Sequence, residues 1–348
     1  MGCEPVSNEK PLVSVVIPNL NGRDMLAGCL RALERQTFKD FEVIIVDNGS
    51  ADDSVEMVRA EFPWLGTIVE NETNVGFAKA CNQGIEAGNG DLIALLNNDT
   101  EAHPDWLGEL VQAAEANPDA GMFASKTLLF DRRDTIDTAG HLIYRDGLNR
   151  GRGRLEVDRG QYDDKTDVFF PSGAAALYRR KMFDEIGTFD EHHFAYGDDI
   201  DIGIRGRLAG WTCVFVPGAV VYHMYSATTG KYSPMKLYLV ERNRLWIVLK
   251  YLPMKYVLLN IFYTKVRYLY HFYGVVHGRG ASARSVSEYS FWELTRTVLR
   301  AYWDAVKAYP RVWGERKRMM KLKKVPDREI DRWFRDYGIS ARDIALQE

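Results

Sequence analysis

The first half of the chain alternates continuous apolar runs with segments of helical periodicity. Apolar runs of strand length occupy Val13–Pro18, Phe41–Asp47, Thr67–Glu70 and Asp91–Asn97. The stretches between them are predicted as helices covering Asp24–Arg35, Asp53–Phe62 and Gly76–Ala87. Strands that are apolar throughout and separated by helices are typical of a parallel sheet covered on both faces. We therefore expect an α/β fold whose ligand lies beyond the carboxyl ends of these strands.

The pattern changes twice further along the chain. Arg132–Asp167 is rich in Gly, Arg and Asp and weakly periodic, which predicts a long loop or a small hairpin, mobile over the site. The sheet is expected to resume at Phe169–Arg180 and to end at Cys213–His223. From Lys236 onward the sequence shows helical periodicity and is rich in basic and aromatic residues. We therefore predict a catalytic domain in residues 1–230 and a helical extension in residues 231–348.

Candidate ligand-binding residues, mostly small and polar, stand at or just after the ends of the predicted strands, where a ligand is expected. They are Pro18, Asn19 and Asn21 at the first strand, Asp47 and Asn48 at the second, Asn74 and Gly76 at the start of the third helix, and Asn98 and Asp99 at the fourth strand. Neither a GxGxxG nor a GxxxxGK[ST] pattern occurs, which disfavours dinucleotide-binding and P-loop sites.

A nucleotide-sugar site would use these residue types. Asp47 can accept a hydrogen bond from the N3–H of uracil or thymine, although an acid in Asp-Asn-Gly is also an ordinary turn residue. Asp99 offers oxygen to a hard divalent cation that bridges two phosphates. Gly76 lets the backbone approach a ligand closely.

The most informative segment is GTFDEHHFAYGDDIDIGIRGRLAGW, residues 187–211. Asp198, Asp199 and Asp201 stand where a helix is predicted to begin. The positive end of a helix favours ionised carboxylates, and an ionised carboxylate there can take a proton from an attacking hydroxyl. Helix capping is the alternative, but it needs only one acid and tolerates a second.

Six motifs occur in the order VSVVIPNLNG, VDNGSADDS, NVGFAKACNQG, LLNND, PSGAAALYRR and the Gly187–Trp211 segment. Over residues 11–225 the sequence resembles the inverting family-2 glycosyltransferases. The resemblance implies the GT-A fold, a Rossmann-like and mostly parallel sheet flanked by helices. It also implies a nucleotide-sugar donor and bound Mg²⁺ or Mn²⁺.

The same resemblance assigns roles to individual residues. Pro18, Asn19 and Asp47 would frame the base and ribose. Asp99 would bind the metal, with His223 completing the site, although Asn97 replaces the first acid of the family's DxD-like element. Asp199 matches the catalytic base, and Asp198 occupies the neighbouring acidic position.

The motifs NVGFAKACNQG, LLNND and RNRLWIVLKYLP are similar to those of rhamnosyltransferase-type enzymes. This similarity implies dTDP-L-rhamnose as donor, a lipid-linked glycan as acceptor and a role in cell-surface polysaccharide synthesis. Galactofuranosyl or other hexosyl transferases that use a UDP-sugar share several of these features and remain an alternative.

Charge is unevenly distributed along the chain. Residues 1–230 hold 21 Lys/Arg against 37 Asp/Glu, whereas residues 231–348 hold 24 against 11. The basic, aromatic extension has no run approaching the ~20 apolar residues that span a bilayer. It suits helices at a membrane surface, with packing in a homo-oligomer as the alternative. Nucleic-acid binding is disfavoured because the acidic half would repel a phosphate backbone.

The cysteines and the polar motifs bear on the expected location and on two alternative functions. The four cysteines, Cys3, Cys29, Cys81 and Cys213, show no paired spacing and indicate free thiols. We expect a cytoplasmic protein, peripheral on the inner face of the plasma membrane. A nucleotidyltransferase would need a basic, Gly-rich loop after the first strand, which NLNGRD does not supply. A non-catalytic, membrane-associated adaptor is disfavoured by the joint presence of Asp47, Asp99, Asp198 and Asp199.

Overall fold

The computed structural model describes residues 10–224 and 233–347. Cys3 lies outside the described residues. Cys29, Cys81 and Cys213 are buried free thiols, as the sequence predicts.

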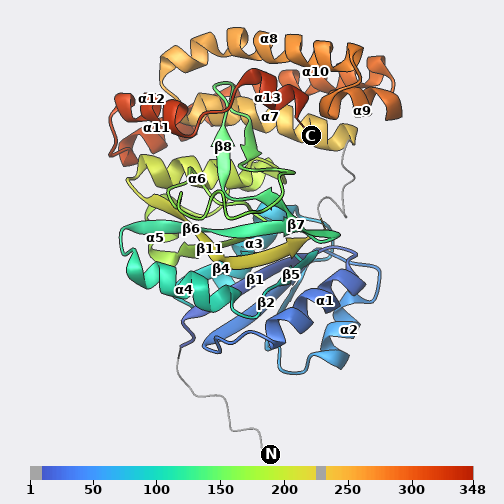
Figure 1. Ribbon diagram of the computed structural model, residues 1–348, viewed down its shortest axis with the longest axis vertical. Coiled ribbons are helices and arrows are strands. Elements are labelled where there is room, and N and C mark those ends of the chain that lie inside the picture. The colour runs from blue at the N-terminus through green and yellow to red at the C-terminus, as the bar shows by residue number, and fades with distance from the viewer. Residues whose placement is uncertain (1–9, 225–232, 348) are drawn as a thin grey trace, which may run out of the picture.

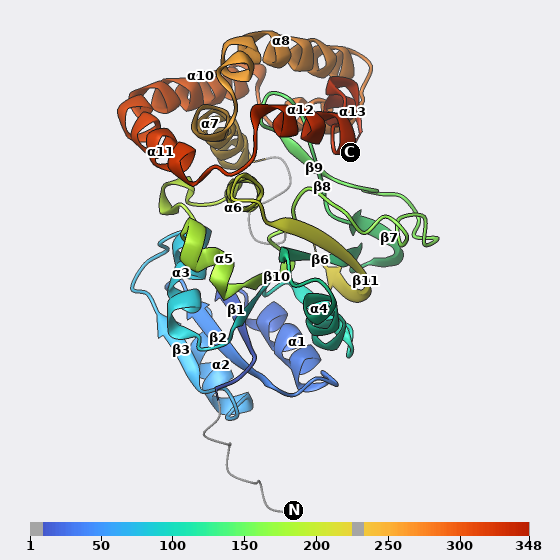
Figure 2. The same ribbon diagram turned by 90° about the vertical axis from the view of Figure 1, so that its left-hand side faces the viewer.

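One nine-stranded sheet organises the first two thirds of the chain (Figures 1 and 2). Four parallel strands lie in the order β3–β2–β1–β4, with bounds β1 (Val13–Asn19), β2 (Phe41–Asp47), β3 (Thr67–Glu70) and β4 (Leu92–Leu96). The sheet continues through β10 (Ala175–Arg179), β6 (Ala120–Leu129), β11 (Thr212–His223) and β5 (Thr100–Ala102), and β7 (Arg132–Thr138) pairs with β6. β10 runs antiparallel to both of its neighbours, and β11 runs parallel to β6. The predicted, mostly parallel sheet is confirmed, but the strand expected over Phe169–Arg180 is limited to β10.

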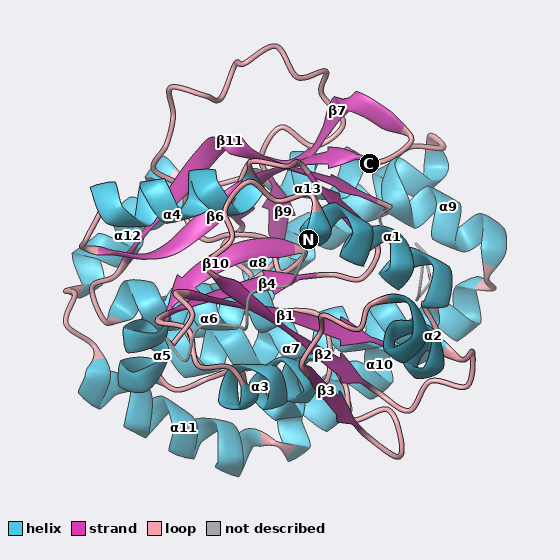
Figure 3. Cartoon of the chain, turned by 90° about the horizontal axis from the view of Figure 1, so that it is seen from below, coloured by secondary structure: helices cyan, strands magenta, loops and turns pink. Residues whose placement is uncertain are grey.

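Helices cover both faces of the sheet (Figure 3). They are α1 (Arg23–Glu34), α2 (Ser54–Glu61), α3 (Phe77–Ala87), α4 (Trp106–Ala116), α5 (Arg180–Ile186) and α6 (Asp198–Leu208). Side chains alternate along β1, so Val16 enters the core beside α3 while Val15 and Ile17 enter the core beside α1. The first three helices and α6 lie where the periodicity predicts them.

The segment predicted as a long loop or a small hairpin, mobile over the site, contains a hairpin that is anchored in the protein. It contains β8 (His141–Ile143) and β9 (Asn149–Gly151), which pair with each other. Between them Asp146 is fully buried and forms an ion pair with Arg267 at 2.6 Å. Arg244 Nη1 also lies 3.8 Å from Asp146 Oδ2, so this buried carboxylate has two cationic partners on the C-terminal helices, which accounts for the close attachment of the hairpin to them.

The described residues after 232 form helices that make up the end of the molecule opposite β2 and α2 (Figure 1). They are α7 (Pro234–Tyr251), α8 (Met254–Val276), α9 (Gly280–Glu288), α10 (Phe291–Lys307), α11 (Tyr309–Leu322), α12 (Asp327–Asp336) and α13 (Ala341–Leu346). α7 is the innermost and contacts α6, so the extension packs directly against the helix that carries Asp199. Among the described residues, no helix has the length and apolar character to cross a membrane.

Candidate active site

Buried amides and a carboxylate join the carboxyl ends of β1, β2 and β4. Asn19 donates its Nδ2 to Asp47 Oδ1 at 2.9 Å, and its Oδ1 accepts from Asn98 Nδ2 at 2.7 Å. All three side chains are buried. The sheet edge thus brings together three residues that the sequence singles out.

The Asp47 carboxylate is already saturated with hydrogen bonds. Its Oδ1 accepts from Asn19 and from Ser50 Oγ, and its Oδ2 accepts from the backbone N–H groups of Gly49 and Ser50. A bond to a base N3–H would have to replace one of these. In this geometry Asp47 shapes the turn after β2, which is the alternative that Asp-Asn-Gly left open.

The remaining expected nucleotide residues line the same edge with different exposures. Pro18 is half-buried at the end of β1, and Asn21 is exposed with its Oδ1 accepting from Ala51 N. Asn48 is buried and accepts from Asn71, while the exposed Asn74 accepts from Gly76 N at 2.9 Å.

The backbone of Gly76 lies close to another segment of the protein. Its φ is +91°, and a Cβ there would meet the carbonyl oxygen of Phe194 at 2.7 Å. The glycine therefore allows the start of α3 to pack against the loop that precedes α6. The close contact of Gly76 within the protein is therefore with Phe194, and its approach to a ligand stays a prediction.

Asp99 and His223 form a pair at the ends of β4 and β11. Asp99 Oδ1 lies 3.4 Å from His223 Nε2, and Asp137 Oδ2 lies 2.8 Å from His223 Nδ1. All three side chains are buried, and Asp99 Oδ1 has no hydrogen-bond partner of good geometry among the described residues. A carboxylate that orients a histidine through Nδ1 is a common second layer around a metal site.

The electrostatics of this group suit a cation. Burial alone would lower the pKa of His223, but the neighbouring carboxylates of Asp137 and Asp99 outweigh it and raise the pKa to about 10. The imidazole of His223 is therefore protonated at neutral pH, and a cation bound at its Nε2 would have to displace that proton. The negative surroundings favour positive charge, and Asp99 Oδ1 and His223 Nε2 are ligand types that fit Mg²⁺ or Mn²⁺. Asp137 was not identified from the sequence, because nothing in the β7 pattern marks it.

The two carboxylates at the start of α6 have unlike environments. Asp198 is buried, whereas Asp199 is partly exposed. Asp199 Oδ1 accepts from Ile200 N at 2.8 Å, and its Oδ2 lies 4.0 Å from His141 Nε2. A Cβ at Gly173 would lie 3.6 Å from Asp198 Oδ2, so the turn before β10 borders the pair.

His141 connects the two parts of the site. It is stacked on Phe170 at a centroid distance of 4.9 Å, and burial lowers its pKa, so its imidazole is neutral. The charges of Asp199 and Asp137 both act on it, in the opposite direction to burial. His141 thus lies within electrostatic reach of both the proposed base and the carboxylate behind His223. A single histidine in AGHLIY gave no sequence signal for this position.

A strained loop presents the pair, and Asn243 of α7 holds that loop. Phe194, Tyr196 and Gly197 all have positive φ. The Asn243 Nδ2 donates to the backbone oxygens of His193, Ala195 and Tyr196 at 3.0, 3.0 and 2.6 Å. Backbone strain of this kind persists where surrounding contacts enforce it. Asn243 is thus a positioning residue, and its only sequence signal was its place within RNRLWIVLKYLP.

Asp201 is structural. It is fully buried and bonds Arg205 Nε at 2.8 Å and Tyr251 OH at 2.5 Å. With Asp190 and His193 it forms a group that has the spacing of metal ligands. Lys250 Nζ, however, lies 3.3 Å from Asp201 Oδ1 and 3.4 Å from His193 Nε2 and also pairs with Asp190. The ammonium of Lys250 supplies the positive charge here, so this group is a weaker metal candidate than the Asp99–His223 pair.

Ionisation of Asp198 should make stability depend on pH. Burial, with the charge of Asp199 beside it, raises the pKa of Asp198 to about 7. An unfolded Asp titrates near pH ~3.9, so the folded chain loses stability as pH rises from there through about 7. We expect Asp198→Asn to be more stable than the native chain by on the order of 2–4 kcal/mol at about pH 8, with little difference near pH ~4.

Urea unfolding at the two pH values measures this difference. Asp24→Asn, at an exposed acid in the first turn of α1, is the matched control. A difference that does not change with pH would contradict the assignment of Asp198.

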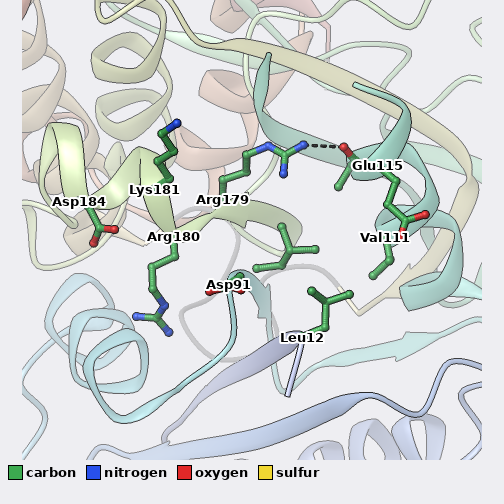
Figure 4. Close-up of a pocket in the computed structure, with 10 residues that line it drawn as sticks. Leu12, Asp91, Val111, Glu115, Arg179, Arg180, Lys181 and Asp184 are labelled. Carbon is green, nitrogen blue, oxygen red and sulfur yellow. Dashed lines mark hydrogen bonds between the residues drawn. The ribbon is translucent and has the colours of Figure 1, made fainter. Parts of the chain in front are cut away.

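A separate hollow lies at the opposite edge of the sheet, near the amino ends of β1 and β4 (Figure 4). Its cationic side chains serve the fold. Arg179 Nε donates to the carbonyl of Ala120 at 2.7 Å, and Arg180 donates to the carbonyls of Ile85, Gly88 and Gly90. Because these guanidinium groups are engaged with backbone oxygens, this hollow is a poor candidate for the functional site.

The chain is similar in sequence to known proteins over part of its length. An uncharacterized protein of Sinorhizobium fredii, y4gI, is 30% identical over 240 residues, which are 63% of this chain and 25% of that protein. The chain thus spans a quarter of the length of that relative. The N-acetylglucosaminyl-diphospho-decaprenol L-rhamnosyltransferase of Mycobacterium tuberculosis is 27% identical over 226 residues, 58% of this chain and 72% of that enzyme.

Solved structures support the fold. GalNAc-T7, solved with UDP, GalNAc and Mn²⁺, superposes with a TM-score of 0.57 at 17% identity, covering 70% of this chain and 48% of that one. At this identity the likeness shows the GT-A fold alone. The family model for glycosyl transferase family 2 matches residues 14–187. The chain therefore belongs to glycosyl transferase family 2, and it is a glycosyltransferase with the GT-A fold.

Proposed function

We propose that the protein is a metal-dependent, inverting glycosyltransferase that moves L-rhamnose from dTDP-rhamnose to a hydroxyl of a lipid-linked glycan. The observation that supports the mechanism is the pairing of a partly exposed carboxylate, Asp199, with His141 at 4.0 Å. The Asp99–His223 pair, at 3.4 Å, supplies the candidate metal ligands at the ends of β4 and β11.

Each group of the candidate active site would have a distinct role. Asp199 would take the proton of the acceptor hydroxyl as that oxygen attacks the anomeric carbon from the face opposite the diphosphate. The neutral His141, 4.0 Å away, borders the base without adding positive charge. Asp99 and His223 would hold Mg²⁺ or Mn²⁺, which supplies charge stabilisation for the departing diphosphate. Direct displacement inverts the sugar configuration.

Donor and acceptor are proposed from similarity. The M. tuberculosis relative is named as an L-rhamnosyltransferase acting on N-acetylglucosaminyl-diphospho-decaprenol, which favours rhamnose and a lipid-linked acceptor for this chain. GalNAc-T7 was solved with UDP, so a UDP-sugar, including a galactofuranosyl donor, is the second candidate. A lipid-linked acceptor would be met at the inner face of the plasma membrane.

Donor binding should be visible as metal-dependent thermal stabilisation. A ligand at about 100 times its Kd stabilises a fold by about 2.7 kcal/mol. We expect a rise in Tm with dTDP-rhamnose and Mg²⁺ or Mn²⁺, and a much smaller rise without metal. Asp99→Asn and His223→Gln should lose the metal-dependent part because each removes a ligand.

His103→Gln, at an exposed histidine, is the matched control and should keep the native response. A metal-dependent rise with UDP-sugars alone would favour the hexosyl alternative. The absence of a rise with every donor would contradict the proposal and favour a non-catalytic adaptor that keeps the transferase fold.

A further inference from the structure

Exposed large apolar side chains are concentrated on two helices of the C-terminal extension. Among the described residues, 19 such side chains are exposed, and 15 of them belong to α8 and α10. On the rest of the described sheet domain and its helices only Trp64 and Val157 are of this kind. A soluble monomer rarely leaves so many large apolar groups in water on one region, so this surface has an occupant.

The exposed groups on α8 follow one helical stripe. Leu258, Ile261, Phe262, Leu269, Phe272 and Val276 recur at spacings of three, four and seven residues. Each is at least 60% exposed. The opposite side of α8 is buried through Tyr256, Asn260, Thr264 and Arg267, so this helix is fixed on the protein and directs a second apolar face outward.

α10 adds a shorter stripe at the same end of the molecule. Trp292, Leu299, Trp303 and Val306 are between 61% and 74% exposed. Figures 1 and 2 both place α8 and α10 at the end away from the sheet, with α8 outermost and lying across that end. Helices that lie across the molecule in this way can enter an interface along their length, without crossing a bilayer.

The charges on this surface distinguish between two occupants, a lipid bilayer and a second copy of the chain. α8 contains no Asp or Glu, and the exposed Lys265 stands in the middle of its apolar stripe. On α10, Arg296, Arg300 and Lys307 are exposed beside the apolar groups, together with the exposed Glu293 and with Asp304, which lies 3.8 Å from Arg300 and 4.0 Å from Lys307. In a two-fold contact between copies the same net-positive surface would stand on both sides, so like charges would be brought close together. An anionic head-group layer instead pairs with them, and a lysine among apolar groups can extend its ammonium to that layer.

We propose that α8 and α10 form an interfacial membrane-binding surface that inserts its apolar stripes into an anionic bilayer. The aromatic residues Phe262, Phe272, Trp292 and Trp303 would lie at the head-group level, and Lys265 would contact lipid phosphates. This inference does not depend on the proposed donor, acceptor or metal. It adds to the transferase function a way of holding the enzyme at the surface where a lipid-linked acceptor would be found.

The test is co-sedimentation of the purified full chain with phosphatidylcholine vesicles, with and without phosphatidylglycerol. We expect binding more than about tenfold tighter to the anionic vesicles, since each nearby cation contributes to attraction. The double variant Ile261→Asp/Leu269→Asp should weaken binding by about 100-fold, because it removes two inserting groups and adds two like charges. Lys265→Gln should weaken binding only to the anionic vesicles.

Val157→Asp is the matched control, since it changes an exposed apolar residue outside this surface. Circular dichroism should show that every variant folds, as the altered side chains are exposed. The proposal is overturned if the native chain binds neither vesicle, or if the double variant binds as the native chain does. It is also overturned if sedimentation without lipid shows a dimer that the double variant dissociates while vesicle binding is unchanged, because a second copy is then the occupant.

Discussion

Asp199→Asn is expected to lower kcat by about 10³-fold while leaving donor affinity nearly unchanged. The asparagine keeps the oxygen that accepts from Ile200 N at 2.8 Å, so the start of α6 should retain its geometry. What it loses is the negative oxygen that takes the proton from the acceptor. Steady-state transfer to a soluble acceptor measures kcat, and calorimetric titration of the donor with metal measures affinity.

The control for this change is again Asp24→Asn, whose carboxylate is 94% exposed at the start of α1 and should have no effect. Turnover of Asp199→Asn within about tenfold of the native rate would remove Asp199 from the role of base, since general bases contribute 10²–10⁴-fold. A loss of donor affinity equal to the loss of kcat would instead indicate a binding role.

Lys250→Met is expected to destabilise the fold by about 3–5 kcal/mol near neutral pH. The Lys250 ammonium is buried and lies 3.3 Å from Asp201 Oδ1 and 3.1 Å from Glu315 Oε2. Methionine fills a similar volume but removes the cation that these carboxylates share, leaving Asp201 with Arg205 and Glu315 with Arg311. The network joins α6 to α7 and α11, so its loss should also loosen the loop that carries Asp198 and Asp199.

The loss of stability in Lys250→Met should depend on pH. Burial raises the pKa of Asp201, but Lys250 and Arg205 outweigh it and hold the pKa well below its usual range. The stability that the ionised pair contributes is therefore present above pH ~4 and is lost as pH falls below it. The deficit of Lys250→Met should accordingly persist from pH ~7 down to pH ~4 and shrink only below it, so pH ~7 and pH ~2 are the values to compare.

Urea unfolding at both pH values tests the network. Lys255→Met is the matched control, because Lys255 pairs with Asp331 on the surface and both side chains are about half exposed. An exposed pair of this kind contributes at most about 1 kcal/mol. Equal destabilisation by the two substitutions would show that the buried network does not stabilise the fold.

The local sequence determined the parts of this protein that follow from short-range physics. Apolar runs and helical periodicity located β1 to β4, and the acids before Ile200 located the start of α6, because period and capping are properties of neighbouring residues. The polar groups after successive strands also met as expected: Asn19, Asp47 and Asn98 bond to one another because parallel strands end at one edge.

Other features of the site depend on segments distant in sequence, and only the tertiary structure decided them. Asp137 reaches His223 across 86 positions, and Asn243 of α7 holds the loop before Asp198 from 47 positions away at its Tyr196 contact. The sequence alone could not separate the three acids of α6 either. Asp201 meets Lys250 and Arg205 in the interior, whereas Asp199 stays partly open to the site. Burial and charge partners set the protonation of a carboxylate, and both are fixed only when distant segments pack together.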